Sequence, residues 1–91
     1  LDVGNLDVWR DFVHVADGIR AFEALLERGE RGQIYNVSSG RARLLQDYVL
    51  FLVSQSKIKM SIRVRKDRLR KEDPPYVEGD NKKLKSLGWQ L

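Results

Sequence analysis

The order of the apolar patterns along the chain limits its possible folds more than any other feature. Short stretches of β-type residues alternate with stretches in which apolar residues recur at helical spacing. This alternation favours an α/β fold, but 91 residues hold too few strands for a complete doubly wound sheet. We therefore expect short strands alternating with three helices in a single domain over 1–91, described as α+β if the chain is an isolated piece.

The first expected helix has the clearest signature. Asp17 is placed to cap its start, because a carboxylate accepts hydrogen bonds from the unpaired amides of the first turn. Gly29 follows its last apolar residue and can adopt the left-handed conformation that commonly ends a helix. The apolar residues recur at helical spacing and form one apolar stripe, made of Ile19, Phe22, Leu25 and Leu26.

A second helix is expected over 44–54, where apolar residues again follow a helical period. Its stripe consists of Leu45, Tyr48, Val49 and Leu52, broadened by Phe51. After it, apolar and polar residues alternate strictly from Ile58 to Val64. Period-two alternation with β-branched residues predicts a half-buried strand with a basic outer face.

The remaining elements are expected to be short. Strands are predicted over 3–6, 12–15 and 34–37, and a third helix over 81–87. Asp80 would cap this helix and Gly88 would end it, just before Trp89. Trp89 is expected to be a packing residue, whereas His14 stands between two valines with no partner that indicates catalysis or metal binding.

Positive charge is concentrated in one part of the chain. The net charge is +4, and eight basic residues lie between Lys57 and Lys71, where Asp67 is the single acidic residue. Such a run is usually a solvated face, but it also attracts polyanions or phosphorylated small molecules. A small basic nucleic-acid-binding domain is therefore an alternative, and a purely structural interaction domain is another. No aromatic residue is interleaved in the run to stack on bases, which disfavours nucleic acid as a partner.

Two absences narrow the possibilities. The chain has no cysteine, which excludes disulfides, thiolate metal sites and a cysteine nucleophile. The longest apolar stretch, Tyr48–Val53, is far shorter than the roughly 20 residues needed to span a membrane. We therefore expect no metal, no membrane partner and a cytoplasmic location.

Four separated segments together resemble the carboxyl-terminal portion of extended short-chain dehydrogenases/reductases, the NAD-dependent epimerase/dehydratase family. They are Gly4–Leu6 with Arg10–Asp17, then Tyr35–Gly40, then Leu69–Asp73, then Gly79–Leu84 with Leu87–Trp89. Each segment is weak alone, but their order and spacing cover nearly the whole chain. The resemblance implies the C-terminal lobe of a Rossmann-type fold that binds a nucleotide sugar.

Within the family, the segments are most similar to enzymes of GDP-6-deoxyhexose synthesis. These are GDP-mannose 4,6-dehydratase and GDP-4-keto-6-deoxymannose reductase, with other NDP-sugar epimerases or dehydratases of the family as alternatives. Phe12 stands where dehydratases usually have Trp, and they often lack an Asn at position 36, so the reductase branch is modestly favoured. The chain also departs from the family pattern, because Lys71 stands where the family usually has a proline.

The resemblance also implies roles for four residues. Arg10 and Arg70 would contact the diphosphate or ribose of a GDP-sugar, and Asp73 would contact the ribose or orient an arginine. Asn36 matches a polar position near the substrate. The residue types suit this task, because the planar guanidinium fork of Arg matches phosphate oxygens better than Lys does.

Two motifs of the family, one for cofactor binding and one for catalysis, have no counterpart in this sequence. There is no glycine-rich dinucleotide loop and no Tyr-x-x-x-Lys pair. We therefore expect a substrate-binding fragment without the N-terminal dinucleotide-binding domain, with no catalytic or cofactor-binding residues and no activity alone. The intact enzyme would use NAD or NADP and form a homo-oligomer.

Overall fold

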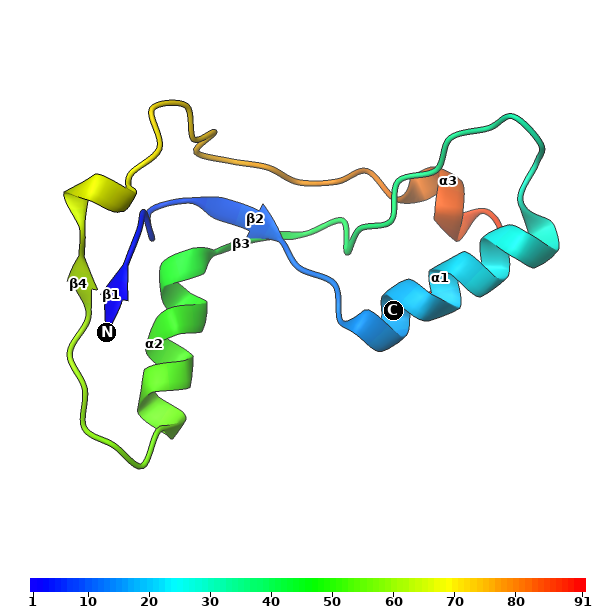
Figure 1. The fold of residues 1–91 in the computed structure, drawn as a ribbon. Coiled ribbons are helices and arrows are strands. Elements are labelled where there is room, and N and C mark those ends of the chain that lie inside the picture. Colours follow the sequence, from blue (N-terminus) through cyan, green and yellow to red (C-terminus); the bar gives the residue numbers. More distant parts are fainter. The chain divides into compact units, whose positions relative to one another are not determined.

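The computed structural model describes residues 1–91 and contains three α-helices, four short strands and one 3-10 helix (Figure 1). In chain order they are β1 (Asp2–Val3), β2 (Trp9–Asp11), α1 (Val15–Arg28), β3 (Ala42–Leu44), α2 (Leu45–Gln55), β4 (Arg63–Val64), the 3-10 helix η1 (Lys66–Arg68) and α3 (Lys82–Lys85). The strands form two two-stranded sheets, β1 with β4 and β2 with β3. The predicted α/β class, with short strands between three helices, is confirmed. None of the helices has the length and apolar character that crossing a membrane requires.

The chain divides into two compact units, and each unit is assembled from segments that are distant in the sequence. Unit 1 consists of Leu1–Arg10 and Arg43–Val77, and unit 2 consists of Asp11–Ala42 and Glu78–Leu91. The chain passes from one unit to the other within both β2 and β3. A single lobe over 1–91 stays a prediction.

Unit 1 is built around the parallel pair of β1 and β4. Asp2 pairs with Arg63 and Val3 with Val64 in this register. The Asp2 carboxylate also accepts two hydrogen bonds from the Arg63 guanidinium, each 3.0 Å long. The start of α2 is held to the segment after β1, because the Leu45 amide donates to the Val8 carbonyl at 2.9 Å.

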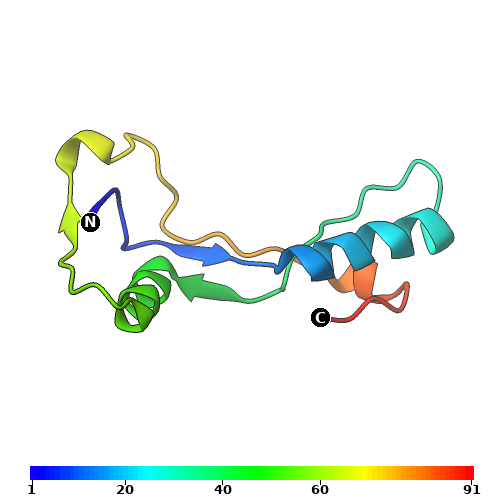
Figure 2. The same ribbon diagram turned by 60° about the horizontal axis from the view of Figure 1, so that its bottom comes forward.

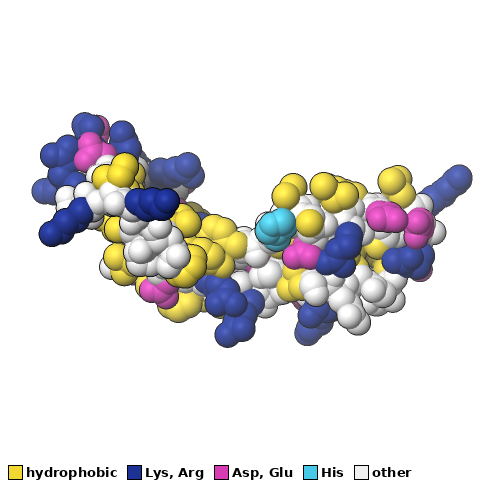
Figure 3. Space-filling model, turned by 90° about the horizontal axis from the view of Figure 1, so that it is seen from below, with side chains coloured by type: hydrophobic (Ala, Val, Ile, Leu, Met, Phe, Trp, Pro, Cys, Tyr) yellow, Lys and Arg dark blue, Asp and Glu magenta, His cyan; other side chains and the backbone are white.

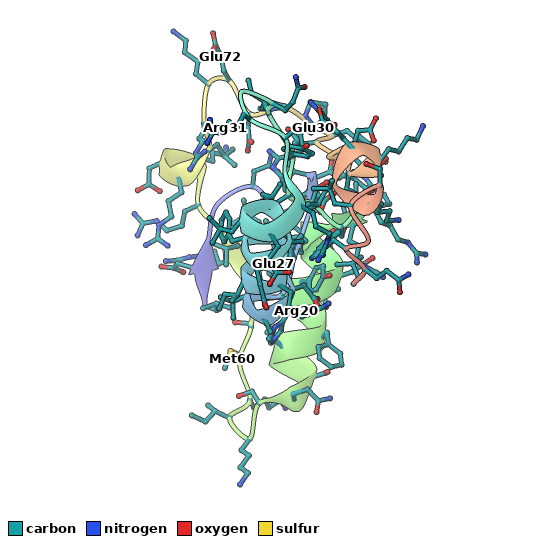
Figure 4. All side chains as sticks on the ribbon, turned by 90° about the vertical axis from the view of Figure 1, so that its right-hand side faces the viewer. Arg20, Glu27, Glu30, Arg31, Met60 and Glu72 are labelled. Atoms are coloured by element: carbon teal, nitrogen blue, oxygen red, sulfur yellow. The ribbon has the colours of Figure 1, made fainter.

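The strand predicted over 58–64 is much shorter in the structure. Only Arg63 and Val64 pair with another strand, because β1 offers just two residues. The predicted inner face is open, with Ile58 exposed at 72% and Met60 lying on the irregular segment after α2 (Figure 4). The prediction of a half-buried strand across the whole segment is therefore wrong.

Unit 2 has a small core between α1 and the C-terminal segment. Ala21 and Ala24 of α1 pack with Leu84 of α3 and with Trp89, and α3 lies against α1 in Figure 2. The indole Nε1 of Trp89 donates to the Asp17 carbonyl at 3.0 Å, which confirms its predicted packing role. Gly88 ends this helical segment with a φ of 94°, a conformation that glycine adopts without a Cβ clash.

The details of α1 differ from the prediction at both ends. Its N-cap is His14, whose Nδ1 accepts from the Ala16 amide at 3.0 Å, so the helix begins before Asp17. Gly29 is the C-cap, but its φ of −68° is not left-handed. The predicted capping by Asp17 and the left-handed end are therefore both wrong.

The predicted apolar stripe of α1 is also open rather than buried. Ile19, Phe22 and Leu26 are exposed at 60%, 61% and 89%. The fully buried residues of the helix, Ala21 and Ala24, are small and allow Leu84 and Trp89 to approach closely, and the partly buried Leu25 packs against the same core. Hydrophobic side chains accordingly lie at the surface of unit 2 in Figure 3.

The other expected elements are confirmed or corrected as follows. The second helix is confirmed, running over Leu45–Gln55. The strands predicted at 12–15 and 34–37 are absent, and strand pairing occurs instead at β2 and β3. The third helix is shorter than predicted, with Asn81 as its N-cap, while the Asp80 carboxylate accepts from the Lys82 amide at 3.0 Å.

Candidate functional site

Unit 1 contains a pocket of about 510 Å³ that is lined by polar, basic and apolar residues. A volume of this size lies within the range of roughly 300–1,000 Å³ typical of small-molecule sites. The lining residues are Val3, Gly4, Asn5, Leu6, Val8, Arg10, Leu45, Arg68, Arg70 and Asp73. Three of the four predicted site residues, Arg10, Arg70 and Asp73, therefore lie in one pocket.

Two backbone features bring the arginines to the pocket. Arg10 lies in β2, where the flanking Trp9 amide donates to the Pro75 carbonyl at 2.8 Å and its carbonyl accepts from Val77 at 3.0 Å. Arg68 is the last residue of η1, which passes close to the chain after β1. A Cβ at Gly4 would lie 3.2 Å from the Arg68 carbonyl oxygen, so glycine permits this approach.

The strongest polar contact in the pocket joins Arg10 to Asp73. Arg10 Nη2 lies 2.5 Å from Asp73 Oδ1, and the two side chains are only 25% and 17% exposed. Arg10 Nη1 donates in addition to the Trp9 carbonyl at 2.8 Å. The partial burial makes this ion pair stronger than a fully exposed one, because it is less screened by solvent.

Asp73 pairs with a different arginine from the one that the sequence suggested, and its role toward a ligand stays a prediction. The sequence placed Asp73 three residues after Arg70, but the carboxylate pairs with Arg10, 63 residues away. Arg70 itself is exposed and makes no ion pair or hydrogen bond with another residue. Arg70 is therefore free to pair with an anionic ligand.

The pocket is electropositive. It is lined by three guanidinium groups (Arg10, Arg68 and Arg70) and one carboxylate (Asp73), which leaves a net charge of three minus one, or +2. Val3, Leu6, Val8 and Leu45 supply apolar surface beside these charges. A ligand with two negative charges and a flat or apolar portion matches such a lining.

Asn36 lies in unit 2 and does not line this pocket. Its Nδ2 donates to the Asp80 carbonyl at 3.4 Å, and the residue is exposed. The structure therefore gives Asn36 a long-range contact with the segment that precedes α3. Its role near a substrate stays a prediction.

Asp11, the residue after Arg10, has a structural task in unit 2. Its Oδ1 accepts from the Ser39 amide at 2.7 Å, and its Oδ2 accepts from the amides of Gly40 at 3.0 Å and Gly79 at 3.2 Å. Desolvation raises the pKa of Asp11, but hydrogen bonds from the Ser39 side chain and from these three amides outweigh it and lower the pKa. Arg10 and Asp11 are thus not partners of each other.

Comparison with known proteins decides which family the chain is related to. The model of the NAD dependent epimerase/dehydratase family matches residues 2–38. GDP-6-deoxy-D-mannose reductase of Pseudomonas aeruginosa is 33% identical to the chain over 91 residues. The chain is therefore similar to members of the NAD-dependent epimerase/dehydratase family. The match covers 99% of the chain but only 30% of that reductase, so the chain spans about 30% of its relative's length.

Two solved structures support the family relationship. The structure of RMD from Pseudomonas aeruginosa complexed with NADPH has a TM-score of 0.86 and 32% identity, and it is matched by 99% of this chain. A crystal structure from Burkholderia cenocepacia J2315, described as that of an epimerase, has a TM-score of 0.87 and 28% identity over 100% of the chain. The chain covers 30% of each. The predicted resemblance to this family is confirmed.

The residues of this chain do not fit the dinucleotide cofactor of the family. A pyrophosphate is bound where a glycine-rich turn leads into a helix. Here α1 is preceded by Asp11-Phe12-Val13-His14 and α2 by the strand β3, neither of which contains glycine.

Sequence reasoning missed two polar residues of the pocket, Asn5 and Arg68. Asn5 belongs to the Gly-Asn-Leu segment that contributed to the family resemblance, but no role was assigned to it. Arg68 is part of the basic run, which was interpreted as a solvated face. Its spacing gave no signal, because Arg68 ends the 3-10 helix η1 rather than lying in an extended segment.

The basic run is partly neutralised within unit 1, where Lys and Arg side chains gather at one end (Figure 3). Arg63 is paired with Asp2, and Arg65 makes two hydrogen bonds, of 2.9 and 2.8 Å, to the Asp67 carboxylate. Arg68 Nη1 donates to the Asp2 carbonyl at 2.8 Å. These contacts make Arg63 and Arg65 part of a surface with internal ion pairs, whereas Arg68 and Arg70 of the same run line the pocket.

Proposed function

We propose that this chain is the sugar-nucleotide-binding part of an NAD(P)-dependent enzyme of GDP-6-deoxyhexose synthesis, of the GDP-6-deoxy-D-mannose reductase type. The observation that carries the proposal is the pocket of unit 1, which gathers Arg10, Arg68 and Arg70 with a net charge of +2. A nucleoside diphosphate sugar carries two phosphate groups, for which guanidinium groups are the preferred ligands. The similar protein of Pseudomonas aeruginosa is named GDP-6-deoxy-D-mannose reductase, which also supports the proposal.

In this proposal the chain binds and orients the substrate and leaves the chemistry to groups outside it. Arg70, which has no protein partner, pairs with the diphosphate, and the held guanidinium of Arg10 contacts the diphosphate or the ribose. The apolar residues beside them exclude water from the bound nucleotide. The nicotinamide of the cofactor supplies hydride exchange with the sugar when it is bound elsewhere in the enzyme.

A titration of the ¹⁵N-labelled 91-residue chain tests substrate binding. GDP and GDP-mannose should shift the amide signals of residues 3–10 and 68–73, and GMP should bind more weakly because it lacks one phosphate. NMR detects dissociation constants in the millimolar range, which correspond to only about 4 kcal/mol of binding free energy. Saturable GDP shifts confined to residues outside the pocket would contradict the proposal.

Arg70→Gln and Lys71→Gln form a matched pair for the same titration. Each removes one positive charge from neighbouring positions, but only Arg70 lines the pocket. We expect Arg70→Gln to weaken GDP binding roughly tenfold, as the loss of one charge-assisted hydrogen bond implies. Lys71→Gln should change it by less than about twofold, since an exposed charge is screened by salt. Equal effects of the two variants would show that only overall charge matters.

Turnover by the chain alone provides a separate test. Because the chain has neither a glycine-rich loop nor a Tyr-x-x-x-Lys pair, we expect no NADPH oxidation when it is mixed with NADPH and a GDP-4-keto-6-deoxyhexose. The measurement is the loss of NADPH absorbance over hours at high protein concentration. Turnover above the rate of a boiled control would refute the assignment of the chemistry to groups outside this chain.

A further inference from the structure

Helix α1 is apolar on two opposite sides, and unit 2 uses only one of them for its core. Ala21 and Ala24 pack against Leu84 and Trp89 on the buried side. The other side carries four large exposed apolar residues, Val15 (71%), Ile19 (60%), Phe22 (61%) and Leu26 (89%). At 3.6 residues per turn these four residues fall within about 60° of one another around the helix axis, and Ala24 lies on the far side of the helix. We call the four exposed residues the α1 seam.

The spacing of the α1 seam indicates which kind of structure can cover it. Its residues follow one another at intervals of four, three and four positions along three turns of helix. This is the spacing at which one helix packs lengthwise against another, with apolar residues repeating every 3.5 positions on average. A second helix can also approach closely, because the neighbouring Gly18 has open space where a Cβ would stand. The occupant that fits the α1 seam is therefore a helix with the same apolar repeat.

Among the helices of this chain, α1 itself is the one with that repeat. The most exposed apolar residues of α2 are Leu50, Phe51 and Leu52. Because these three are consecutive, they point in different directions around the helix axis and form no seam. Helix α3 has only four residues, and its buried residue Leu84 belongs to the core.

The α1 seam is self-complementary about a two-fold axis that passes between Ile19 and Phe22. Intervals of four, three and four are the same in both directions along the helix. An antiparallel second copy therefore places its Leu26 opposite Val15 and its Phe22 opposite Ile19. Such reciprocal matching is what a two-fold symmetric interface requires, since residue i then contacts residue j and j contacts i.

Charge and area both permit this pairing. The four positions that flank the seam are Ala16, Gly18, Glu23 and Leu25, of which only Glu23 is charged, so like charges do not line the contact. The seam of each copy offers an area on the order of 500 Å², so that two copies would bury about 1,000 Å², the lower limit for a specific interface. We expect a weak dimer with a dissociation constant of roughly 0.1 mM. At low micromolar concentrations the chain is then monomeric and the α1 seam is open.

We propose that the α1 seam is the contact surface between two copies of this chain, which associate through antiparallel α1 helices. The proposal goes beyond the proposed function, because it concerns a surface of unit 2 and does not depend on a ligand in unit 1.

Sedimentation equilibrium of the full 91-residue chain from about 10 μM to 1 mM tests the association. The mean mass of the wild-type chain should rise from that of a monomer toward that of a dimer. Phe22→Glu should weaken the association at least about tenfold, because it places a charge in the apolar contact. Phe51→Glu is the matched control, since Phe51 on α2 is also 61% exposed but lies outside the seam, and it should change the association by less than about twofold.

The amide spectrum of each variant shows that it is folded, and Leu26→Glu provides a second substitution in the seam if Phe22→Glu is not. A wild-type chain that stays monomeric at about 1 mM would overturn the proposal and leave the seam to a different protein segment. Equal weakening by Phe22→Glu and Phe51→Glu would also overturn it, because the association would then be unspecific.

Disulfide cross-linking tests the antiparallel arrangement, and the absence of native cysteines makes single-cysteine variants simple to interpret. Antiparallel pairing places position 15 of one copy beside position 26 of the other. Two copies of the same position are 11 residues, or about 16 Å, apart along the helices, which is too far for a disulfide. A mixture of Val15→Cys and Leu26→Cys should therefore form a mixed disulfide dimer, detected by its mass, much faster than either variant forms one alone. Faster cross-linking of Val15→Cys with itself, or no mixed disulfide, would refute the antiparallel contact.

Discussion

At the residue scale, neighbouring positions in this chain serve different purposes. Arg10 pairs with Asp73 in unit 1, and Asp11 accepts three backbone hydrogen bonds in unit 2. The sequence indicated that Arg10, Arg70 and Asp73 would lie together, and they do. It could not indicate that Asp73 pairs with Arg10, because that contact spans 63 residues and depends on how the chain folds back.

Asp11→Asn should destabilise the chain by about 1–3 kcal/mol, the cost of leaving a partly buried donor without an acceptor. Both Asp11 oxygens accept from amides, so in either orientation the new NH₂ group faces a backbone N–H. Asp7→Asn is the control, because the Asp7 side chain is exposed and makes no hydrogen bond. Urea unfolding curves of the two variants give the free energies of unfolding. Equal stabilities would contradict the structural role of Asp11.

The lowered pKa of Asp11 also predicts how stability depends on pH. The unfolded chain binds a proton at Asp11 near the ordinary pKa of about 3.9, whereas the folded chain does so only at lower pH. The contribution of Asp11 is therefore complete above pH 4 and is lost as the pH falls through its folded pKa. Asp11→Asn should remove this part of the pH dependence. Unfolding curves measured between pH 2 and pH 6 would show whether the two profiles converge in acid.

At the element scale, the helices were more predictable from the sequence than the strands. The second helix was located to within a residue, because its signal is local and repeats over three turns. The strand expected over 58–64 was largely wrong, since a strand needs a partner and β1 provides only two residues. The expected stripe of α1 is apolar as predicted, but its exposure depends on what packs there, which no local pattern reveals.

Two Leu→Ala substitutions in unit 2 test which face of α1 carries the stability. Leu84 is fully buried against α1, and its truncation should cost about 2–5 kcal/mol. Leu26 is 89% exposed on α1, so the same substitution there should change stability by less than about 0.5 kcal/mol. Thermal unfolding followed by circular dichroism compares the two. A large loss at Leu26 would mean that this face is covered in the folded chain.

The charged side chains of α1 lie outside the core of unit 2. Arg20 and Glu27 lie on this helix, and Glu30 and Arg31 follow in the turn after it (Figure 4). Arg20 donates to the Gln90 carbonyl at 2.8 Å, and Arg28 donates to the Leu87 carbonyl at 2.6 Å. These contacts tie the C-terminal segment to α1 at two points, on either side of the buried Trp89.

At the scale of the whole molecule, each unit depends on two segments that are far apart in the sequence. The core of unit 2 takes Ala21 and Ala24 from α1 but Leu84 and Trp89 from the last residues. Deletion of residues 78–91 should therefore leave α1 without its packing partners and abolish the protection of its amides from hydrogen exchange. The amides of Arg63 and Arg65, which donate to carbonyls of β1, serve as the internal reference. Retained protection in α1 would show that the helix is stable without that core.

The parallel pairing of β1 with β4 has a consequence for the synthesis of the protein. Asp2 and Arg63 are 61 residues apart, and Arg10 and Asp73 are 63 residues apart. At translation rates of about 5–20 residues per second, β1 is synthesised roughly 3 to 12 seconds before its partner strand β4. During that interval Arg10 has no carboxylate to hold it. The pocket can therefore form only after residues 63–73 have been synthesised. Slow synthesis of these residues would delay ligand binding more than it would delay the formation of helices.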